Sequence, residues 1–150
     1  MNILFVCTGN TCRSPMAEGM MRQLAALHGL EMEVKSAGVF AMVGAPASSH
    51  TDTILRNRGI DDFFHSSQTV TPELIEWSDL ILTMTTSHKD ILLSYFPAAI
   101  PKTFTIKEYV INEENGDVTD PFGGPLEAYQ ETEKELNEIL NKMITKFLNS

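Results

Sequence analysis

The sequence is 150 residues long, the size of one compact domain, and its apolar share of 43% is sufficient for a continuous core without a metal ion or a disulfide. The formal net charge of -9 favours solubility and disfavours nucleic acid and anionic lipid as partners, because most of the surface repels polyanions. An anionic substrate would therefore require a locally positive pocket.

The first residues and the two cysteines indicate the cellular compartment of the protein. Met1 to Val6 contains an apolar run but lacks the basic start, the apolar length and the small-residue cleavage pattern of a secretory signal. No apolar stretch approaches the roughly 20 residues that span a bilayer, so we expect a cytoplasmic protein with no membrane partner. Cys7 and Cys12 are the only cysteines. In a reducing compartment so close a pair indicates catalysis, redox sensing or metal binding more often than a structural disulfide.

The first half of the chain alternates strand and helix patterns. Residues 3–6 form a short apolar run that predicts a buried parallel strand ending at Cys7. Ser14 is predicted to be a helix N-cap with Pro15 at the first helical position, and apolar residues at helical spacing continue the helix to Gly29. A second strand over residues 31–36, a loop through 46 and a helix over 48–59 are expected next.

The second half continues the alternation. A short helix opens at Thr71 and Pro72, a third strand covers residues 79–84, a helix runs to about Tyr95, and a fourth strand is expected over 102–106. The last helix has one apolar stripe, made of Leu136, Ile139, Leu140, Met143, Ile144 and Phe147. This pattern predicts an α/β fold: one domain over residues 1–150, built as a three-layer sandwich with an open four-stranded parallel sheet and helices on both faces. A ligand site is expected at the carboxyl ends of the strands.

The loop after the first strand carries the chemistry. Cys7 and Arg13 stand at its two ends, where the strand passes into a helix N-terminus. Such a loop can turn several backbone N–H groups inward, and the helix adds the positive end of its dipole, so a tetrahedral oxyanion fits there. Gly9 and Asn10 are residue types that accept the left-handed backbone of such a loop.

The same electropositive loop stabilises a thiolate, so we expect Cys7 to be ionised at neutral pH. The planar guanidinium of Arg13 can bind two phosphate oxygens and stabilise the charge that develops in a transition state. Ser14 could donate a hydrogen bond to the sulfur and help it to leave.

This loop resembles that of the low-molecular-weight protein tyrosine phosphatase family, whose signature is a Cys-x5-Arg-Ser loop after the first strand. The match extends to the Gly-Asn pair, the second cysteine and the Ser-Pro start of the helix. The resemblance implies that Cys7 is a nucleophile that becomes transiently phosphorylated, that Arg13 binds phosphate, and that no cofactor takes part. It also implies a set of substrate-binding residues in the loop: Thr8, Gly9, Asn10, Thr11, Cys12 and Ser14.

The resemblance also implies an aspartate followed by proline, far downstream, as the proton donor to the leaving group. Asp120 and Pro121 fit that pattern. The same carboxylate would then activate water against the phosphocysteine. Asp117 is the nearby competitor, but no proline follows it.

Two further positions match supporting elements of the family. Ser36 and His65 correspond to residues that hold the loop asparagine, here Asn10, in place. His65 could instead be a loop histidine without a role. The other histidines (His28, His50 and His88) lie in unrelated segments without ligand spacing, so no metal site is expected.

The substrate prediction depends on two departures from tyrosine-directed members. Those members carry a bulky aliphatic residue where this chain has Thr11, and two aromatic residues where it has Phe122 and Gly123. The combination is similar to the bacterial protein-arginine phosphatase branch, which implies phosphorylated proteins as partners and phosphate as product and competing ligand. Phosphoarginine presents a polar guanidinium, which a small hydroxyl and an ionised Asp120 could favour. Phe40 and Phe122 are candidate walls of the pocket, or else anchors of their loops.

Other classes remain as alternatives. A tyrosine phosphatase would share the whole mechanism. An arsenate reductase would share the first loop but needs cysteines beyond Cys12, and none follows it. A phosphocarrier or redox-sensing module would not need Asp120. Cys12 could form a reversible disulfide that protects Cys7, or could simply be a small buried residue that shapes the loop.

Overall fold

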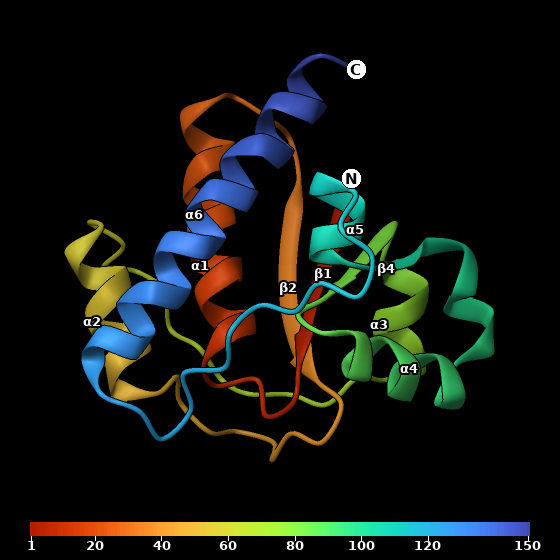
Figure 1. Cartoon of the computed structure of the whole chain (residues 1–150), viewed down its shortest axis with the longest axis horizontal. Coiled ribbons are helices and arrows are strands. Elements are labelled where there is room, and N and C mark those ends of the chain that lie inside the picture. The colour runs from red at the N-terminus through yellow and green to blue at the C-terminus, as the bar shows by residue number, and fades with distance from the viewer.

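The computed structural model describes all 150 residues and contains a four-stranded parallel sheet between two layers of helices (Figure 1). The strands lie in the order β2-β1-β3-β4 and all pair in parallel. They are β1 (Asn2–Cys7), β2 (Glu33–Gly38), β3 (Leu80–Thr83) and β4 (Thr103–Thr105). This confirms the predicted α/β fold with an open four-stranded parallel sheet.

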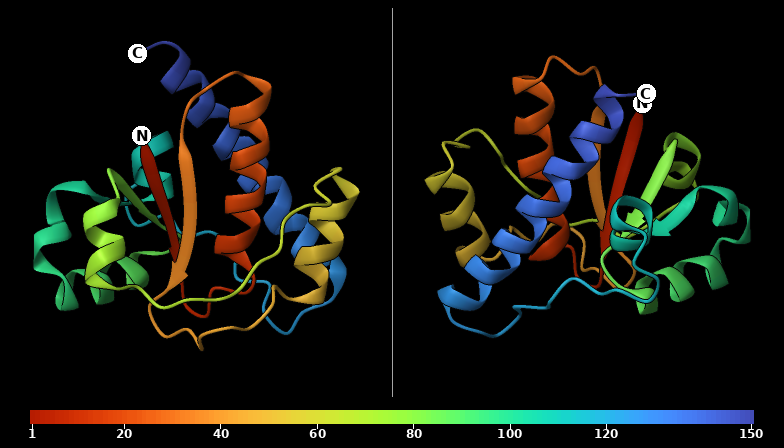
Figure 2. Two further views of the ribbon diagram at one scale, coloured as in Figure 1. Left: turned by 180° about the vertical axis from the view of Figure 1, so that it is seen from behind. Right: turned by 45° about the horizontal axis from the view of Figure 1, so that its top comes forward.

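The helices cover both faces of the sheet (Figures 1 and 2). One face packs against α1 (Arg13–Leu27), α2 (Ser49–Asn57), α5 (Ile106–Ile111) and α6 (Leu126–Leu148). The other packs against α3 (Pro72–Trp77), α4 (Thr86–Tyr95) and the 3-10 helix η1 (Pro97–Lys102). None of these helices has both the length and the apolar character needed to cross a bilayer.

The central strand β1 divides the core in two. Ile3, Phe5 and Cys7 face the larger cluster under α1 and α6, whereas Leu4 and Val6 face the smaller cluster under α3 and α4. All five are at most 3% exposed. Because a strand buried on both sides needs apolar residues at every position, this explains the uninterrupted apolar run in the sequence.

The carboxyl ends of β1 and β2 lie at the end of the sheet opposite the two chain termini (Figures 1 and 2). β1 ends at Cys7, which pairs with Gly38 at the end of β2. A Cβ atom on Gly38 would collide with the carbonyl oxygen of Thr8, and the same oxygen accepts a hydrogen bond from the N–H of Phe40. Only glycine therefore allows β2 to pack this closely against the loop that follows Cys7.

Two strands have other bounds than predicted, and one helix was not predicted. The second strand begins at Glu33 and continues to Gly38, because it stays in register with β1 to its last residue. The expected fourth strand is only Thr103–Thr105, since η1 ends at Lys102 and α5 starts at Ile106. α5 was not predicted, although Thr105 and Glu108 form its capping box.

The start of α1 also differs from the prediction. The helix begins at Arg13, so Ser14 is inside its first turn and is not the N-cap. The N-cap position is Cys12, whose side chain makes no capping hydrogen bond. The hydroxyl of Ser14 is instead 2.9 Å from the sulfur of Cys7. Because Ser14 does not cap the helix, its hydroxyl is free to contact the sulfur of Cys7.

Candidate active site

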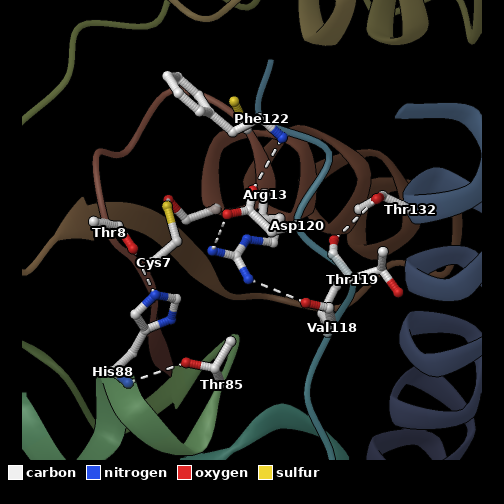
Figure 3. Close-up of polar contacts among 12 residues, drawn as sticks. Cys7, Thr8, Arg13, Thr85, His88, Val118, Thr119, Asp120, Phe122 and Thr132 are labelled. Atoms are coloured by element: carbon white, nitrogen blue, oxygen red, sulfur yellow. Dashed lines mark hydrogen bonds and ion pairs between the residues drawn. The ribbon is translucent and has the colours of Figure 1, made fainter. Parts of the chain in front are cut away.

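The cysteine loop, which we define as residues 7–13, connects β1 directly to α1 (Figure 3). Asn10 has a φ of 58° and provides the left-handed residue that the turn requires. Gly9 does not have a positive φ, and a Cβ atom there would meet only the hydroxyl of Thr11, at 3.9 Å. The prediction of left-handed backbone is therefore confirmed for Asn10 and wrong for Gly9.

The sulfur of Cys7 contacts polar groups from its own loop and from the first turn of α1. Cys7 is 3% exposed and its Sγ is 2.9 Å from the hydroxyl of Ser14. The N–H of Asn10 donates to the same sulfur at 3.3 Å. Two hydrogen bonds and the N-terminus of α1 lie where a negative charge on sulfur would be stabilised.

A cavity of about 240 Å³ opens beside this sulfur. Gly9, Thr11 and Cys12 line the cavity, and their backbone N–H groups donate to no acceptor within the protein. The complete lining consists of Cys7, Thr8, Gly9, Thr11, Cys12, Arg13, Asp120 and Phe122. Unpaired N–H groups around a concave loop form a site for a tetrahedral anion.

The guanidinium of Arg13 connects the cysteine loop to the segment that precedes α6. Arg13 is 5% exposed, and its Nη1 donates to the carbonyl oxygen of Val118 at 3.0 Å. Its Nη2 lies 3.5 Å from Oδ2 of Asp120 (Figure 3). This cation is therefore fixed at the cavity with donors remaining for an oxyanion.

The aspartate loop, which we define as residues 117–124, forms the other side of the cavity. The carboxylate of Asp120 accepts a hydrogen bond from the N–H of Phe122 at 3.0 Å, and its side chain is 55% exposed. Phe122 is 77% exposed. The hydroxyl of Thr132 on α6 donates to the carbonyl oxygen of Thr119 at 3.0 Å. The loop is thus anchored at its base, while Asp120 and Phe122 face solvent and the cavity.

A buried network supports Asn10 from below. Its side-chain amide donates to the hydroxyls of Ser14 and Ser36 at 2.9 and 2.8 Å. Ser36 in turn donates to the carboxylate of Glu18 at 2.6 Å, and the N–H of Gln68 donates to the amide oxygen of Asn10 at 2.9 Å. The hydrogen bond to Ser36 is the contact that its predicted support of Asn10 requires.

His65 contacts the backbone of the same residue. Its Nε2 lies 2.5 Å from the carbonyl oxygen of Asn10. Burial lowers the pKa of His65, while the hydrogen bond to Asn10 opposes the shift and nearby Arg22 adds to it. A neutral ring that donates from Nε2 satisfies this geometry, and this is the contact that the predicted support of the loop by His65 requires.

Glu18 is the buried acid at the far end of this network. Desolvation raises its pKa, against the opposing effects of the hydrogen bond from Ser36 and the charges of Arg22 and Lys35. Its other carboxylate oxygen is 2.5 Å from Nη2 of Arg22. The ion pair with Arg22 stabilises a carboxylate in this buried position, which in turn orients Ser36.

Three predicted substrate-binding residues (Phe40, Asn10 and Ser14) do not line the cavity, and neither does the competitor Asp117. Phe40 is 61% exposed and lines a different, apolar hollow with Val39, Tyr95 and Phe96, so its predicted role as a wall is not supported. Asn10 and Ser14 are outside the lining, and each contacts the sulfur of Cys7 from the side away from the cavity opening through the hydrogen bonds given above. Asp117 is outside the lining, since its carboxylate accepts from the N–H of Thr86 at α4.

Three residues that sequence reasoning missed lie around the loop: Glu18, Gln68 and His88. His88, on α4, places Nε2 2.8 Å from the hydroxyl of Thr8 (Figure 3). Burial and the charge of Arg13 lower the pKa of His88 to about 4, against the opposing effects of Asp120 and Asp117. No spacing in the sequence connects His88 with Thr8, because the contact arises only when α4 packs on the sheet and reaches the cysteine loop.

Cys12 contacts α6, whereas Thr8 of the same loop contacts α4. It is 6% exposed, and its sulfur is 3.4 Å from the hydroxyl of Tyr129 on α6. Both cysteines are free thiols. No group of three or more His, Cys, Asp or Glu side chains is arranged to hold a metal ion.

Known proteins share both the sequence and this architecture. The family model described as low molecular weight phosphotyrosine protein phosphatase matches residues 2–150. The chain belongs to this family. A protein-arginine-phosphatase of Geobacillus stearothermophilus is 46% identical over 146 residues, which cover 96% of this chain and 94% of the relative. The low molecular weight protein-tyrosine-phosphatase PtpB of Staphylococcus aureus is 37% identical over 143 residues, covering 95% of this chain and 96% of that protein.

A solved structure extends the comparison. It is a mutant of the YwlE arginine phosphatase with a phosphorylated active-site serine, and it matches with a TM-score of 0.94 at 45% identity, covering 97% of this chain and 95% of that one. The family predicted from the cysteine loop is confirmed, and this low molecular weight phosphatase is a cysteine-dependent protein phosphatase.

Proposed function

We propose that this low molecular weight phosphatase hydrolyses phosphoarginine in proteins through a phosphocysteine intermediate on Cys7. The observation that carries the proposal is the wall of the cavity, where Phe122 is the only aromatic ring and Thr11 and Asp120 supply polar atoms. A phenol ring would find little apolar surface there, whereas a guanidinium would meet a carboxylate and one aromatic face. The similarity to protein-arginine phosphatases supports the same substrate.

In the first step, the thiolate of Cys7 attacks phosphorus while the guanidinium of Arg13 and the free N–H groups of the loop bind the phosphoryl oxygens. A phosphorus–sulfur bond forms and the phosphorus–nitrogen bond to the substrate arginine breaks. Asp120 orients the departing guanidine and donates a proton to its nitrogen, so that arginine leaves as a guanidinium and Asp120 is left as a carboxylate for the next step. The charge that develops on the oxygens is stabilised by donors that are already in place.

In the second step, Asp120 takes a proton from water, which attacks the phosphocysteine. The phosphorus–sulfur bond breaks, inorganic phosphate is released and the thiolate of Cys7 is restored. The hydroxyl of Ser14, 2.9 Å from the sulfur, stabilises the thiolate as it leaves. The same carboxylate thus serves both steps from an exposed position at the mouth of the cavity.

Phosphotyrosine is the second candidate substrate, since the family description and the similarity to PtpB favour it. The reductase alternative lacks support, because Cys7 and Cys12 are the only cysteines. A pure phosphocarrier would have no use for a carboxylate beside the cavity, and Asp120 lines it. A disulfide between Cys12 and Cys7 stays a prediction, which would be tested by recovery of a Cys12→Ser variant from peroxide.

The substrate is tested by side-by-side hydrolysis of phosphoarginine, phosphotyrosine and phosphoserine peptides. We expect the highest kcat/KM for phosphoarginine, and no turnover of any peptide by a Cys7→Ser variant. Thr11→Ile should shift the ratio of the first two activities toward phosphotyrosine by about tenfold, since it replaces a hydroxyl with apolar surface. Faster hydrolysis of phosphotyrosine by the unmodified protein would contradict the proposal.

Thr11→Val is the matched control for that variant. It removes the hydroxyl at nearly constant volume, so it separates the loss of a polar atom from the gain of bulk. If Thr11→Val shifts the ratio as far as Thr11→Ile does, the hydroxyl sets the preference. If only Thr11→Ile shifts it, the size of the wall does.

The proposed mechanism also supports a cellular location and a domain organisation for the protein. A nucleophilic Cys7 must stay reduced, and the cytoplasm keeps thiols reduced, so we keep it as the proposed location. We also keep residues 1–150 as a single phosphatase domain, because both halves of the site depend on the same sheet.

A further inference from the structure

The contact between His88 and Thr8 has no part in the mechanism above. His88 is in the first turn of α4 and is 4% exposed, and its backbone N–H donates to the hydroxyl of Thr85, the N-cap residue. Its ring reaches across to the cysteine loop and places Nε2 2.8 Å from the hydroxyl of Thr8 (Figure 3). Thr8 in turn lines the cavity beside Cys7.

The other ring nitrogen decides which atom of this pair donates. Nδ1 of His88 is buried and has no hydrogen-bond partner. A proton there would leave a buried N–H group without an acceptor, which costs more than an unused lone pair. The ring therefore carries its proton on Nε2 and donates it to the hydroxyl oxygen of Thr8.

That direction leaves the hydroxyl hydrogen of Thr8 without a partner in the protein. The ring of His88 is the only hydrogen-bond partner of this hydroxyl. Once its oxygen accepts from the ring, the hydroxyl is free to turn its own hydrogen toward the cavity that Thr8 lines. A hydroxyl aligned in this way is an additional donor at the rim of the anion site.

We propose that His88 is a positioning residue that orients the hydroxyl of Thr8 as a side-chain donor to a phosphoryl oxygen. The inference rests on the proposed function only in taking the cavity as a phosphate site, and not on which amino acid carries the phosphate. Burial beside Arg13 supports it, because it keeps the ring neutral with a single proton to place. The neutral ring thus acts through Thr8 and touches no substrate atom.

The test is a direct calorimetric titration of inorganic phosphate into four variants. Thr8→Val removes the hydroxyl, and His88→Leu removes the ring donor. Each should weaken phosphate binding by about tenfold, the usual value of a hydrogen bond to a charged group. Their combination should be no weaker than the worse single variant, because both remove the same contact. His88→Gln can donate from its amide nitrogen and should stay within about threefold of the unmodified protein.

Two further measurements distinguish positioning from packing. Nitrogen NMR of the unmodified protein should find Nε2 of His88 protonated and Nδ1 unprotonated. His28→Gln, at the exposed end of α1, is the matched control for loss of a histidine and should bind phosphate normally. Additive losses in the double variant, a proton on Nδ1, or equal losses in His88→Gln and His88→Leu would each overturn the inference.

The outcomes also separate this inference from the proposed function. If the unmodified protein binds no inorganic phosphate, the cavity is not a phosphate site and both fail. If it binds phosphate but Thr8→Val binds equally well, only the role of His88 and Thr8 fails.

Discussion

The two loops that meet at the cavity are built in opposite ways. The cysteine loop is mostly buried, and its key side chain, Asn10, uses its amide for two donated hydrogen bonds and one accepted one. The aspartate loop is fixed at its base, where the N–H of Val118 donates to the carbonyl oxygen of Met84 at 2.9 Å. Beyond that base, Asp120 and Phe122 are mostly exposed.

The difference separates two tasks of the site. Binding an oxyanion needs donors whose positions are fixed before the ligand arrives, and a buried network achieves this during folding. Choosing a leaving group needs contact with whatever lies beyond the phosphate, and an exposed loop can change its residues without disturbing the core. Changes in the buried network of the cysteine loop should therefore weaken phosphate binding, whereas loss of the exposed carboxylate of Asp120 should slow turnover and leave phosphate binding intact.

Asp120→Asn is expected to have the largest effect of the variants in this comparison. Loss of the carboxylate should lower kcat by about 10² to 10⁴, the usual contribution of general acid–base catalysis. Binding of inorganic phosphate should not weaken, because the variant removes a negative charge 3.5 Å from Nη2 of Arg13. Steady-state kinetics and a phosphate titration of the same preparation measure the two effects.

Asp117→Asn is the matched control on the same loop. Its side-chain oxygen can still accept from the N–H of Thr86, so the base of the aspartate loop should hold and kcat should change little. An equal loss of turnover in both variants would contradict the assignment of Asp120, and not Asp117, as the general acid and base.

Ser36→Ala tests the buried side of the comparison, with a smaller effect. It removes an acceptor from the amide of Asn10 and a donor from the carboxylate of Glu18, both in the interior. Unsatisfied buried groups should lower the free energy of unfolding by about 1–3 kcal/mol and weaken phosphate binding by roughly three- to tenfold. Chemical denaturation and phosphate titration measure both. Ser66→Ala, at an exposed position near His65, is the control. Similar losses of stability and phosphate binding in this variant would show that the buried network has no special role.

The sequence was most informative where the site is continuous along the chain. Cys7 and Arg13 are six positions apart, and the strand before them and the helix after them have clear local patterns, so their placement could be predicted. Asp120 could be predicted only through resemblance to a family, because no local pattern connects it with a loop more than 100 residues earlier. The role of the serine at position 14 was misassigned as a cap, since the helix begins one residue before it.

Contacts between distant segments account for the rest. Glu18, Gln68 and His88 lie on three different segments, and only the packed sheet and helices bring them to the cysteine loop. The boundary at Ile106 was missed for a related reason, since the strand before it has only three residues and too few to show a period. Residue type alone makes Phe40 a candidate for either the pocket wall or a loop anchor, because it does not determine the direction of a side chain.

The smallest expected effect concerns His88, which lies beneath both loops and is influenced by Arg13 from one and Asp120 from the other. Its pKa of about 4 in the folded protein is below the ordinary value of 6.5, so the unfolded chain binds a proton that the folded protein does not. The resulting stability is complete above about pH 6.5 and is lost as the pH falls toward 4.

The decrease in the melting temperature, Tm, on acidification measures this contribution. Between about pH 7.5 and about pH 5.5 the loss is roughly 1 kcal/mol, or about 2–4 °C in Tm. His88→Gln removes the titrating ring, so its Tm should fall by that much less over the same interval, while His28→Gln keeps the full decrease. The lowered pKa of His65 acts in the same direction in all three proteins and cancels from the difference. Parallel curves for His88→Gln and the unmodified protein would mean that the ring between the two loops takes up its proton in the folded state as readily as in the unfolded chain.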